Sequence, residues 1–152
     1  MARRIRVYLD TSVISAHVDP RDPARRQLTR DLWPSLASYE ACICLFVLEE
    51  IRATRDETRR AEMLALAAPF TMIPWVAEMD RLADCYLAAG AFAPALISDA
   101  RHVAAAVVGG ADILLSWNYR HLVNRTRRTK VNLVNAQQGY NHIEIIAPPE
   151  LA

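Results

Sequence analysis

Residues 5–12 read IRVYLDTS, and this stretch decides how the chain begins to fold. From Ile5 to Leu9, apolar or β-branched residues alternate with other types, which predicts a short strand. The strand ends abruptly at Asp10, Thr11 and Ser12, residue types that favour helix N-termini over strand interiors. The stretch therefore predicts a strand that runs directly into a helix.

The rest of the chain repeats this order of strand and helix. Short apolar runs predict further strands at 41–45, 70–73, 113–116 and 142–146, and helical spacing predicts helices at 23–38, from 46, at 56–68, over 76–87 and from 99. Pro34 is expected to kink the first of these helices, and Ser98 to cap the last. Because the strands lack a clean polar face and alternate with helices, the sequence predicts a parallel sheet between helices, an α/β fold.

Length and composition favour one soluble globular domain over residues 1–152. With 53% hydrophobic and 23% charged residues, the chain is unlike disordered or collagen-like proteins. Three cysteines are too few for a disulfide scaffold, and Cys42 and Cys44 are expected in the core. The longest uncharged stretch, residues 63–77, contains two prolines and is shorter than the ~18 apolar residues of a membrane span. We therefore expect no membrane segment and a cytoplasmic location.

Polar residues fall where the predicted strands end, which is where open α/β sheets bind ligands. Asp10 follows the first strand, and Glu50 lies one turn into the helix after the second, with Glu49 as an alternative. Asp99 begins a buried helix. Asn118 lies just beyond a later strand. We expect these side chains at one edge of the sheet.

Asp112 differs from these residues because it precedes its strand. It is therefore expected at the opposite edge of the sheet, as a structural cap.

Converging carboxylates would repel each other and raise each other's proton affinity unless a cation lies among them. Mg²⁺ and Mn²⁺ take oxygen ligands and leave room for water and a substrate phosphate. The pattern therefore favours hydrolysis of a phosphodiester by a metal-activated water. A structural alternative stays open, since Asp10 is also a common helix cap and Asp99 is favoured by the helix dipole alone.

Charge along the chain is uneven, although the net charge is only +1. Residues 113–143 contain no Asp or Glu, and five cations lie within them: Arg120, Arg125, Arg127, Arg128 and Lys130. Such a run attracts phosphate backbones, or it forms an ordinary solvated face. The four histidines are scattered and are expected to be surface or packing residues, and Trp117 a core or interface aromatic.

Four segments resemble the PIN domain, and most closely the VapC-type toxins of bacterial type II toxin–antitoxin pairs. They are YLDTSVI at 8–14, VLEEI at 47–51, SDARHVA at 98–104 and ADILLSWNYRHL at 111–122. Their order and spacing match over essentially the whole chain. The resemblance implies an α/β/α sandwich around a five-stranded parallel sheet. It also implies a metal-dependent endoribonuclease that is usually a homodimer and is held inactive by a cognate antitoxin.

The motif match assigns roles to particular residues. Asp10, Glu50 and Asp99 would bind Mg²⁺ or Mn²⁺. Asn118 stands where the family has a fourth acid, and it can offer an amide oxygen but can neither act as a base nor carry negative charge. All four would be catalytic residues. Thr11 or Ser12 would supply a further hydroxyl by the same match.

The cations supply candidates for binding the RNA backbone. Arg101, Arg120 and the cluster at 125–130 are the residues we expect to contact phosphates.

Two other interpretations remain. The chain would be a non-catalytic PIN domain that binds RNA or a protein partner if Asn118 abolishes activity. An unrelated phosphotransfer domain would also place Asp after the first strand, but Ser12 stands where a dehalogenase-like site needs a second Asp, and a receiver's acid pair is missing.

Overall fold

Five parallel strands form the centre of the computed structural model, which describes residues 3–151. The strands are β1 (Arg6–Leu9), β2 (Glu40–Cys44), β3 (Thr71–Ile73), β4 (Ile113–Leu115) and β5 (Glu144–Ile146). Their order in the sheet is β3-β2-β1-β4-β5, and every neighbouring pair is parallel. The predicted α/β fold with a five-stranded parallel sheet is confirmed.

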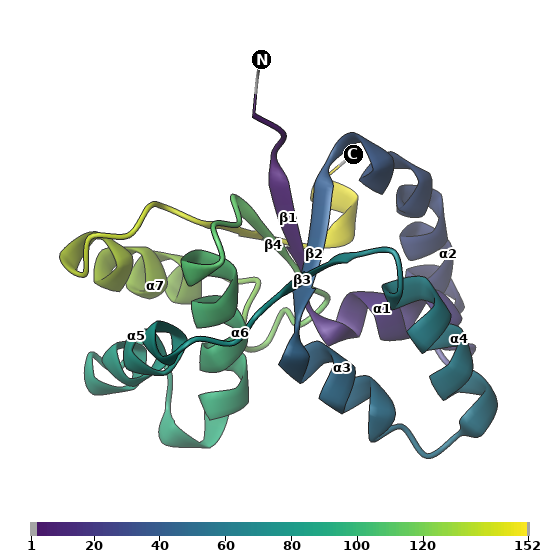
Figure 1. Cartoon of the computed structure of the whole chain (residues 1–152), viewed down its shortest axis with the longest axis horizontal. Coiled ribbons are helices and arrows are strands. Elements are labelled where there is room, and N and C mark those ends of the chain that lie inside the picture. Colours follow the sequence, from purple (N-terminus) through teal and green to yellow (C-terminus); the bar gives the residue numbers. More distant parts are fainter. Residues whose placement is uncertain (1–2, 152) are drawn as a thin grey trace.

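Helices cover both faces of the sheet, as Figure 1 shows. On one face lie α1 (Thr11–Val18), α2 (Pro23–Leu32), α3 (Leu45–Arg52) and α4 (Glu57–Ala67). On the other lie α5 (Ala77–Ala88), α6 (Ile97–Val108) and α7 (Arg125–Gln137). Three short 3-10 helices complete the fold: η1 (Trp33–Ser38), η2 (Pro94–Leu96) and η3 (Pro148–Glu150). The arrangement is the three-layer α/β/α sandwich that the resemblance implied.

The pairing of β1 with β4 positions the edge of the sheet where ligands are expected. Leu9 pairs with Leu115, so the two strands end at the same level. The backbone N–H of Asp10 then donates to the carbonyl of Leu115 at 3.0 Å. Asp10 and Ser116 therefore follow neighbouring strands side by side.

Two predicted helix boundaries were wrong. The helix expected over 23–38 ends at Leu32 and continues as η1, because Pro34 lacks the N–H that an α-helix would use there. Ser98 does not cap α6, which begins at Ile97 directly after η2 and has Leu96 in the cap position.

The structure bears out several other local expectations. Asp112 lies at the opposite edge of the sheet, where its carboxylate accepts the backbone N–H of Arg6 at 2.9 Å and the guanidinium of Arg3 at 2.7 Å. Trp117 is buried, and its indole N–H donates to the Thr29 hydroxyl at 2.9 Å. Cys42 and Cys44 are buried in the core.

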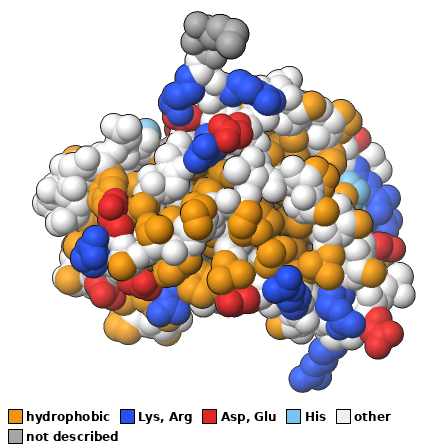
Figure 2. Space-filling model, in the orientation of Figure 1, with side chains coloured by type: hydrophobic (Ala, Val, Ile, Leu, Met, Phe, Trp, Pro, Cys, Tyr) orange, Lys and Arg blue, Asp and Glu red, His pale blue; other side chains and the backbone are white. Residues whose placement is uncertain are grey.

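The edge strand β3 lies on the face of the molecule that Figure 2 shows, with hydrophobic side chains gathered across its middle. Met72 in β3 and Val76 just after it are exposed. The strand has only three residues and is followed by Pro74, features that limit pairing with another chain. None of the helices within residues 3–151 is long and apolar enough to cross a membrane.

Asp19 provides a pH-dependent contribution to stability. Its carboxylate accepts the backbone N–H and the guanidinium of Arg21, which lowers the pKa of Asp19 to about 2. An unfolded Asp has a pKa of about 3.9, so the carboxylate stabilises the folded state above that pH and loses the effect as pH falls toward 2. We expect Asp19→Asn to lower the free energy of unfolding at pH 7. In urea unfolding at several pH values the difference from the parent should vanish near pH 2, and a constant difference would contradict this assignment.

Candidate active site

Asp10 stands where β1 meets α1, yet its carboxylate does not cap the helix. Its Oδ2 instead accepts hydrogen bonds from the hydroxyls of Ser12 and Ser116, both at 2.8 Å. Asp10 is only 7% exposed. The helix-cap alternative for this side chain is therefore wrong, and the acid is held in place by one hydroxyl from α1 and one that follows β4.

Ser116 is a residue of this site that the sequence did not single out. It is fully buried, donates to Asp10 and accepts the backbone N–H of Asn118 at 3.0 Å. The Ser12 hydroxyl in turn accepts the backbone N–H of Trp117 at 3.0 Å. A hydroxyl residue at the end of the strand beside β1 was the signal that could have identified it.

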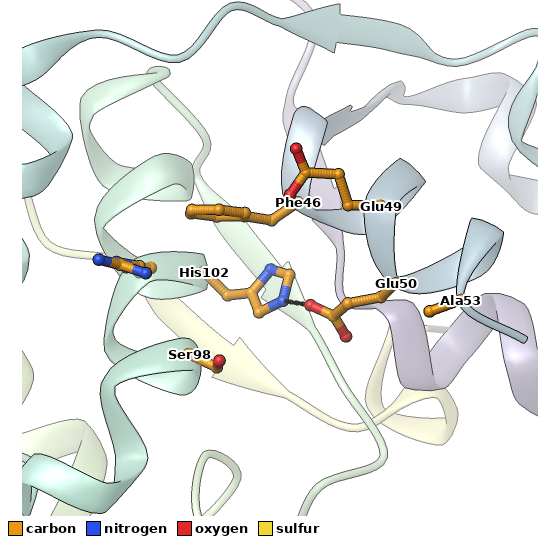
Figure 3. A pocket seen from close by; sticks show the side chains of 7 residues that line it. Phe46, Glu49, Glu50, Ala53, Ser98 and His102 are labelled. Carbon is orange, nitrogen blue, oxygen red and sulfur yellow. Dashed lines mark hydrogen bonds and ion pairs between the residues drawn. The ribbon is translucent and has the colours of Figure 1, made fainter.

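Glu50 meets the site from α3 and contacts His102 of α6 (Figure 3). Its Oε1 is hydrogen-bonded to Nε2 of His102, and the same Nε2 lies 3.9 Å from Oδ1 of Asp10. In Figure 3 the carboxylate of Glu49 points away from the imidazole. Of the two candidate glutamates, Glu50 is the one that joins Asp10 around this ring.

Two buried side chains, Tyr8 and Cys44, are linked by hydrogen bonds to the other nitrogen of the His102 ring. His102 is 2% exposed, and its Nδ1 lies 2.7 Å from the Tyr8 hydroxyl, which lies 3.0 Å from the Cys44 sulfur. Burial lowers the pKa of His102, but its interactions with Cys44 and Glu50 and the negative charge of Asp10 outweigh burial and raise the pKa well above the usual value. These interactions favour the protonated form of the ring, which lies beside the carboxylates of Asp10 and Glu50. His102 is thus a buried histidine, as expected, and it also joins two of the candidate acids.

Asp99 lies in the first turn of α6 and is half-buried. Its pKa is raised, first by burial and next by the negative charge of Asp10, with a smaller contribution from Glu50, and these outweigh the lowering by His121 and His102. For Glu50, burial raises the pKa, but the hydrogen bond and charge of His102 outweigh it and lower the value. The three acids thus share one electrostatic environment that holds an excess of negative charge.

The donors at this edge match a hard divalent cation in their chemistry. Carboxylate oxygens come from three parts of the fold, and such oxygens are the ligands that hard divalent cations prefer. The buried Thr11 hydroxyl has no hydrogen-bond partner within residues 3–151. It lies close enough to Glu50 to lower the pKa of that carboxyl. In the described part of the chain, no group of three or more His, Cys, Asp and Glu side chains is placed to hold a metal as it stands. Glu50 is instead engaged by His102.

Asn118 performs a structural task at this edge. Its Oδ1 accepts the backbone N–H of His121 at 2.9 Å, and its backbone carbonyl accepts the N–H groups of Leu122 and Val123. The side chain thus caps the turn that follows β4. Its amide oxygen is therefore already engaged by the backbone.

The basic residues divide into free and structural groups. Arg120 is exposed, and its guanidinium makes no hydrogen bond within residues 3–151. Arg101 is half-buried and lines the same pocket as Glu50. Arg127 donates to the carbonyls of His121 and Ala91. Arg128 donates to the carbonyl of Ile145. The cluster at 125–130 therefore offers fewer free cations than its sequence suggests.

The support of His102 can be tested with Tyr8→Phe. Loss of the hydroxyl leaves a buried imidazole nitrogen and the Cys44 sulfur without this partner, which is expected to cost about 1–3 kcal/mol in the free energy of unfolding. Tyr119→Phe is the matched control, because Tyr119 is exposed and its hydroxyl makes no hydrogen bond in the described chain. Equal urea midpoints for the two variants would contradict the prediction that the Tyr8 hydroxyl stabilises the folded state.

Comparison with known proteins adds one finding. Neither a protein-family model nor a curated protein matches the sequence. The chain is similar to a solved structure described as VapBC2 from Rickettsia felis bound to a DNA fragment from their promoter, with a TM-score of 0.59 and 10% sequence identity. The match covers 94% of this chain and 98% of the other. At such low identity the similarity concerns the fold, and the fold of this chain is PIN-like.

Proposed function

We propose that the chain is a Mg²⁺- or Mn²⁺-dependent endoribonuclease, the toxin component of a type II toxin–antitoxin pair. The observation that supports the proposal is that Asp10 and Glu50 both lie against His102, at the edge of a PIN-like sheet where open α/β sheets bind ligands. The negative charges of Asp10 and Glu50 also raise the pKa of Asp99, which would join them. The activity would reside in a single domain over residues 1–152 and would act on cytoplasmic RNA.

Each residue has a role in this proposal. Asp10, Glu50 and Asp99 would hold the cation, with Ser12 and Ser116 fixing the Asp10 carboxylate. When bound, the cation lowers the pKa of a water molecule and stabilises charge that develops on the phosphate.

The remaining residues would bind or orient the substrate. Thr11 offers its unpartnered hydroxyl, and Arg101 and Arg120 would hold RNA phosphates. Asn118 would act indirectly, by shaping the turn after β4.

The proposed partner is a cognate antitoxin. The similarity in fold to a chain of the VapBC2 complex supports it. We also propose that the chain forms a homodimer.

A second candidate function is a non-catalytic PIN domain that binds RNA or a protein. The observation that favours it is Asn118, which supplies no negative charge and whose side-chain oxygen is already bonded to the backbone.

Removal of the metal tests the proposal. We expect the purified chain to cut total or transfer RNA into discrete fragments with Mn²⁺ or Mg²⁺ and to stop cutting in EDTA, because the acids need a cation to approach a phosphate. RNA binding without metal-dependent fragments would instead support the non-catalytic module. A preparation of the Asp99→Asn variant controls for contaminating nuclease.

A further inference from the structure

A small pocket opens directly beside the acids, between α3 and α6 (Figure 3). Its volume is about 280 Å³, and its lining includes Phe46, Glu49, Ser98 and Arg101. Glu50 and His102 form the wall that it shares with the candidate active site. This volume lies just below the roughly 300–1,000 Å³ of pockets for drug-sized ligands, so the pocket suits a small group such as a single ring system.

Two opposite charges line this pocket without being paired. Within residues 3–151, neither Glu49 nor Arg101 makes a side-chain hydrogen bond or salt bridge, although both border the same space. Glu49 is a pure acceptor, whereas Arg101 is a pure donor. A ligand that matches both must therefore present donors along one edge and acceptors along another.

An aromatic wall completes the pocket. The Arg101 guanidinium lies 5.4 Å from the centre of the Phe46 ring, and Trp75 packs edge-on against that ring at 4.5 Å. The ring is thus held in place from the side. Aromatic rings and guanidinium planes are the surfaces on which unpaired RNA bases stack.

We propose that this pocket binds a guanine base of the RNA, next to the phosphate that the acids act on. Guanine offers the adjacent N1–H and N2–H donors to one carboxylate, here Glu49, and its O6 and N7 acceptors to a guanidinium, here Arg101. Adenine and cytosine offer a carboxylate only an amino group, and uracil only one ring N–H. The inference rests on the proposed ribonuclease function, and it makes Glu49 a specificity-determining residue.

The test is direct binding of the four nucleoside 5′-monophosphates, without RNA cleavage. In NMR titrations of the parent chain, GMP is expected to shift the amides of α3 around Glu49 and to bind about 10-fold or more tightly than AMP, CMP and UMP, since a bidentate pair discriminates by about 1–3 kcal/mol. Glu49→Gln keeps the length of the side chain but replaces one acceptor oxygen by a donor NH₂, so it cannot pair with the adjacent N1–H and N2–H donors side by side. This variant should therefore lose the preference for GMP. Glu57→Gln, an exposed glutamate of α4, is the matched control and should keep it.

The outcomes separate this inference from the proposed function. Equal binding of all four nucleotides, shifts confined to residues outside the pocket, or an unchanged preference in Glu49→Gln would overturn the guanine pocket. Metal-dependent cleavage of RNA with no preference for sites beside guanine would overturn it as well, while the ribonuclease proposal would stand. Selective binding of GMP without any metal-dependent cleavage would support the pocket and count against the ribonuclease.

Discussion

Replacing Asp99 by asparagine is expected to reduce metal-dependent RNA cleavage by about 100- to 1,000-fold, the size of effect seen when one electrostatic stabiliser of a transition state is removed. Asp99 shares the negative field of Asp10 and Glu50, and its carboxylate makes no hydrogen bond within residues 3–151. Its charge is thus free to meet a cation. Initial rates of cleavage at saturating Mn²⁺ measure the effect.

The same variant should keep its fold, which separates a catalytic from a structural role. Burial and Asp10 raise the pKa of Asp99, so its ionised form destabilises the folded state at pH 7, and the neutral amide should leave the melting temperature unchanged or higher. Asp84→Asn is the matched control, because Asp84 is exposed on α5. If Asp99→Asn cleaved RNA as fast as the Asp84 control, the assignment of the site would be wrong.

Truncation of Leu114 to alanine is expected to be the most destabilising of these substitutions. Leu114 is fully buried in β4, where it pairs with Tyr8 on one side and Ile145 on the other. Removing its side chain leaves a cavity in a packed sheet layer, which costs about 2–5 kcal/mol. Urea unfolding followed by circular dichroism measures the loss.

Leu133→Ala serves as the control for this prediction. Leu133 lies on α7 and is 60% exposed, so its truncation should change the free energy of unfolding by no more than about 0.5 kcal/mol. Similar losses for the two variants would show that β4 is not the packed centre of the core.

The order of strands and helices could be predicted from local patterns. The apolar run that ends at Asp10 indicated a strand followed by a helix, and β1 and α1 confirm it. Gly109 and Gly110 ended α6 as expected, with Gly110 at a positive φ of 80° that glycine adopts readily. The start of α6 could not be predicted from Ser98, because η2 continues directly into the helix.

The acids of the candidate site could also be selected from sequence, because each follows or faces the end of a strand. Their partners could not. His102 looked like one of four scattered histidines, and only the packing of α6 on the sheet brings it to Tyr8 of β1 and Glu50 of α3. The basic cluster at 125–130 was likewise expected to be exposed to solvent or RNA. Arg127 and Arg128 instead donate to the backbone carbonyls of Ala91 and Ile145, which are distant in sequence.

The sequence by itself determined the α/β alternation and the places where carboxylates leave the strands, because hydrophobic period and helix-start residues act over a few neighbouring positions. Only the tertiary structure decided which charged side chains lie next to each other. Asp10 follows β1, Glu50 lies in α3 and His102 in α6, and the distance between such groups depends on strand register and helix packing. Burial at that junction lowers the pKa of His102, but its interactions with Cys44, Glu50 and Asp10 outweigh burial and raise it. Burial and the negative charge of Asp10 both raise the pKa of Asp99.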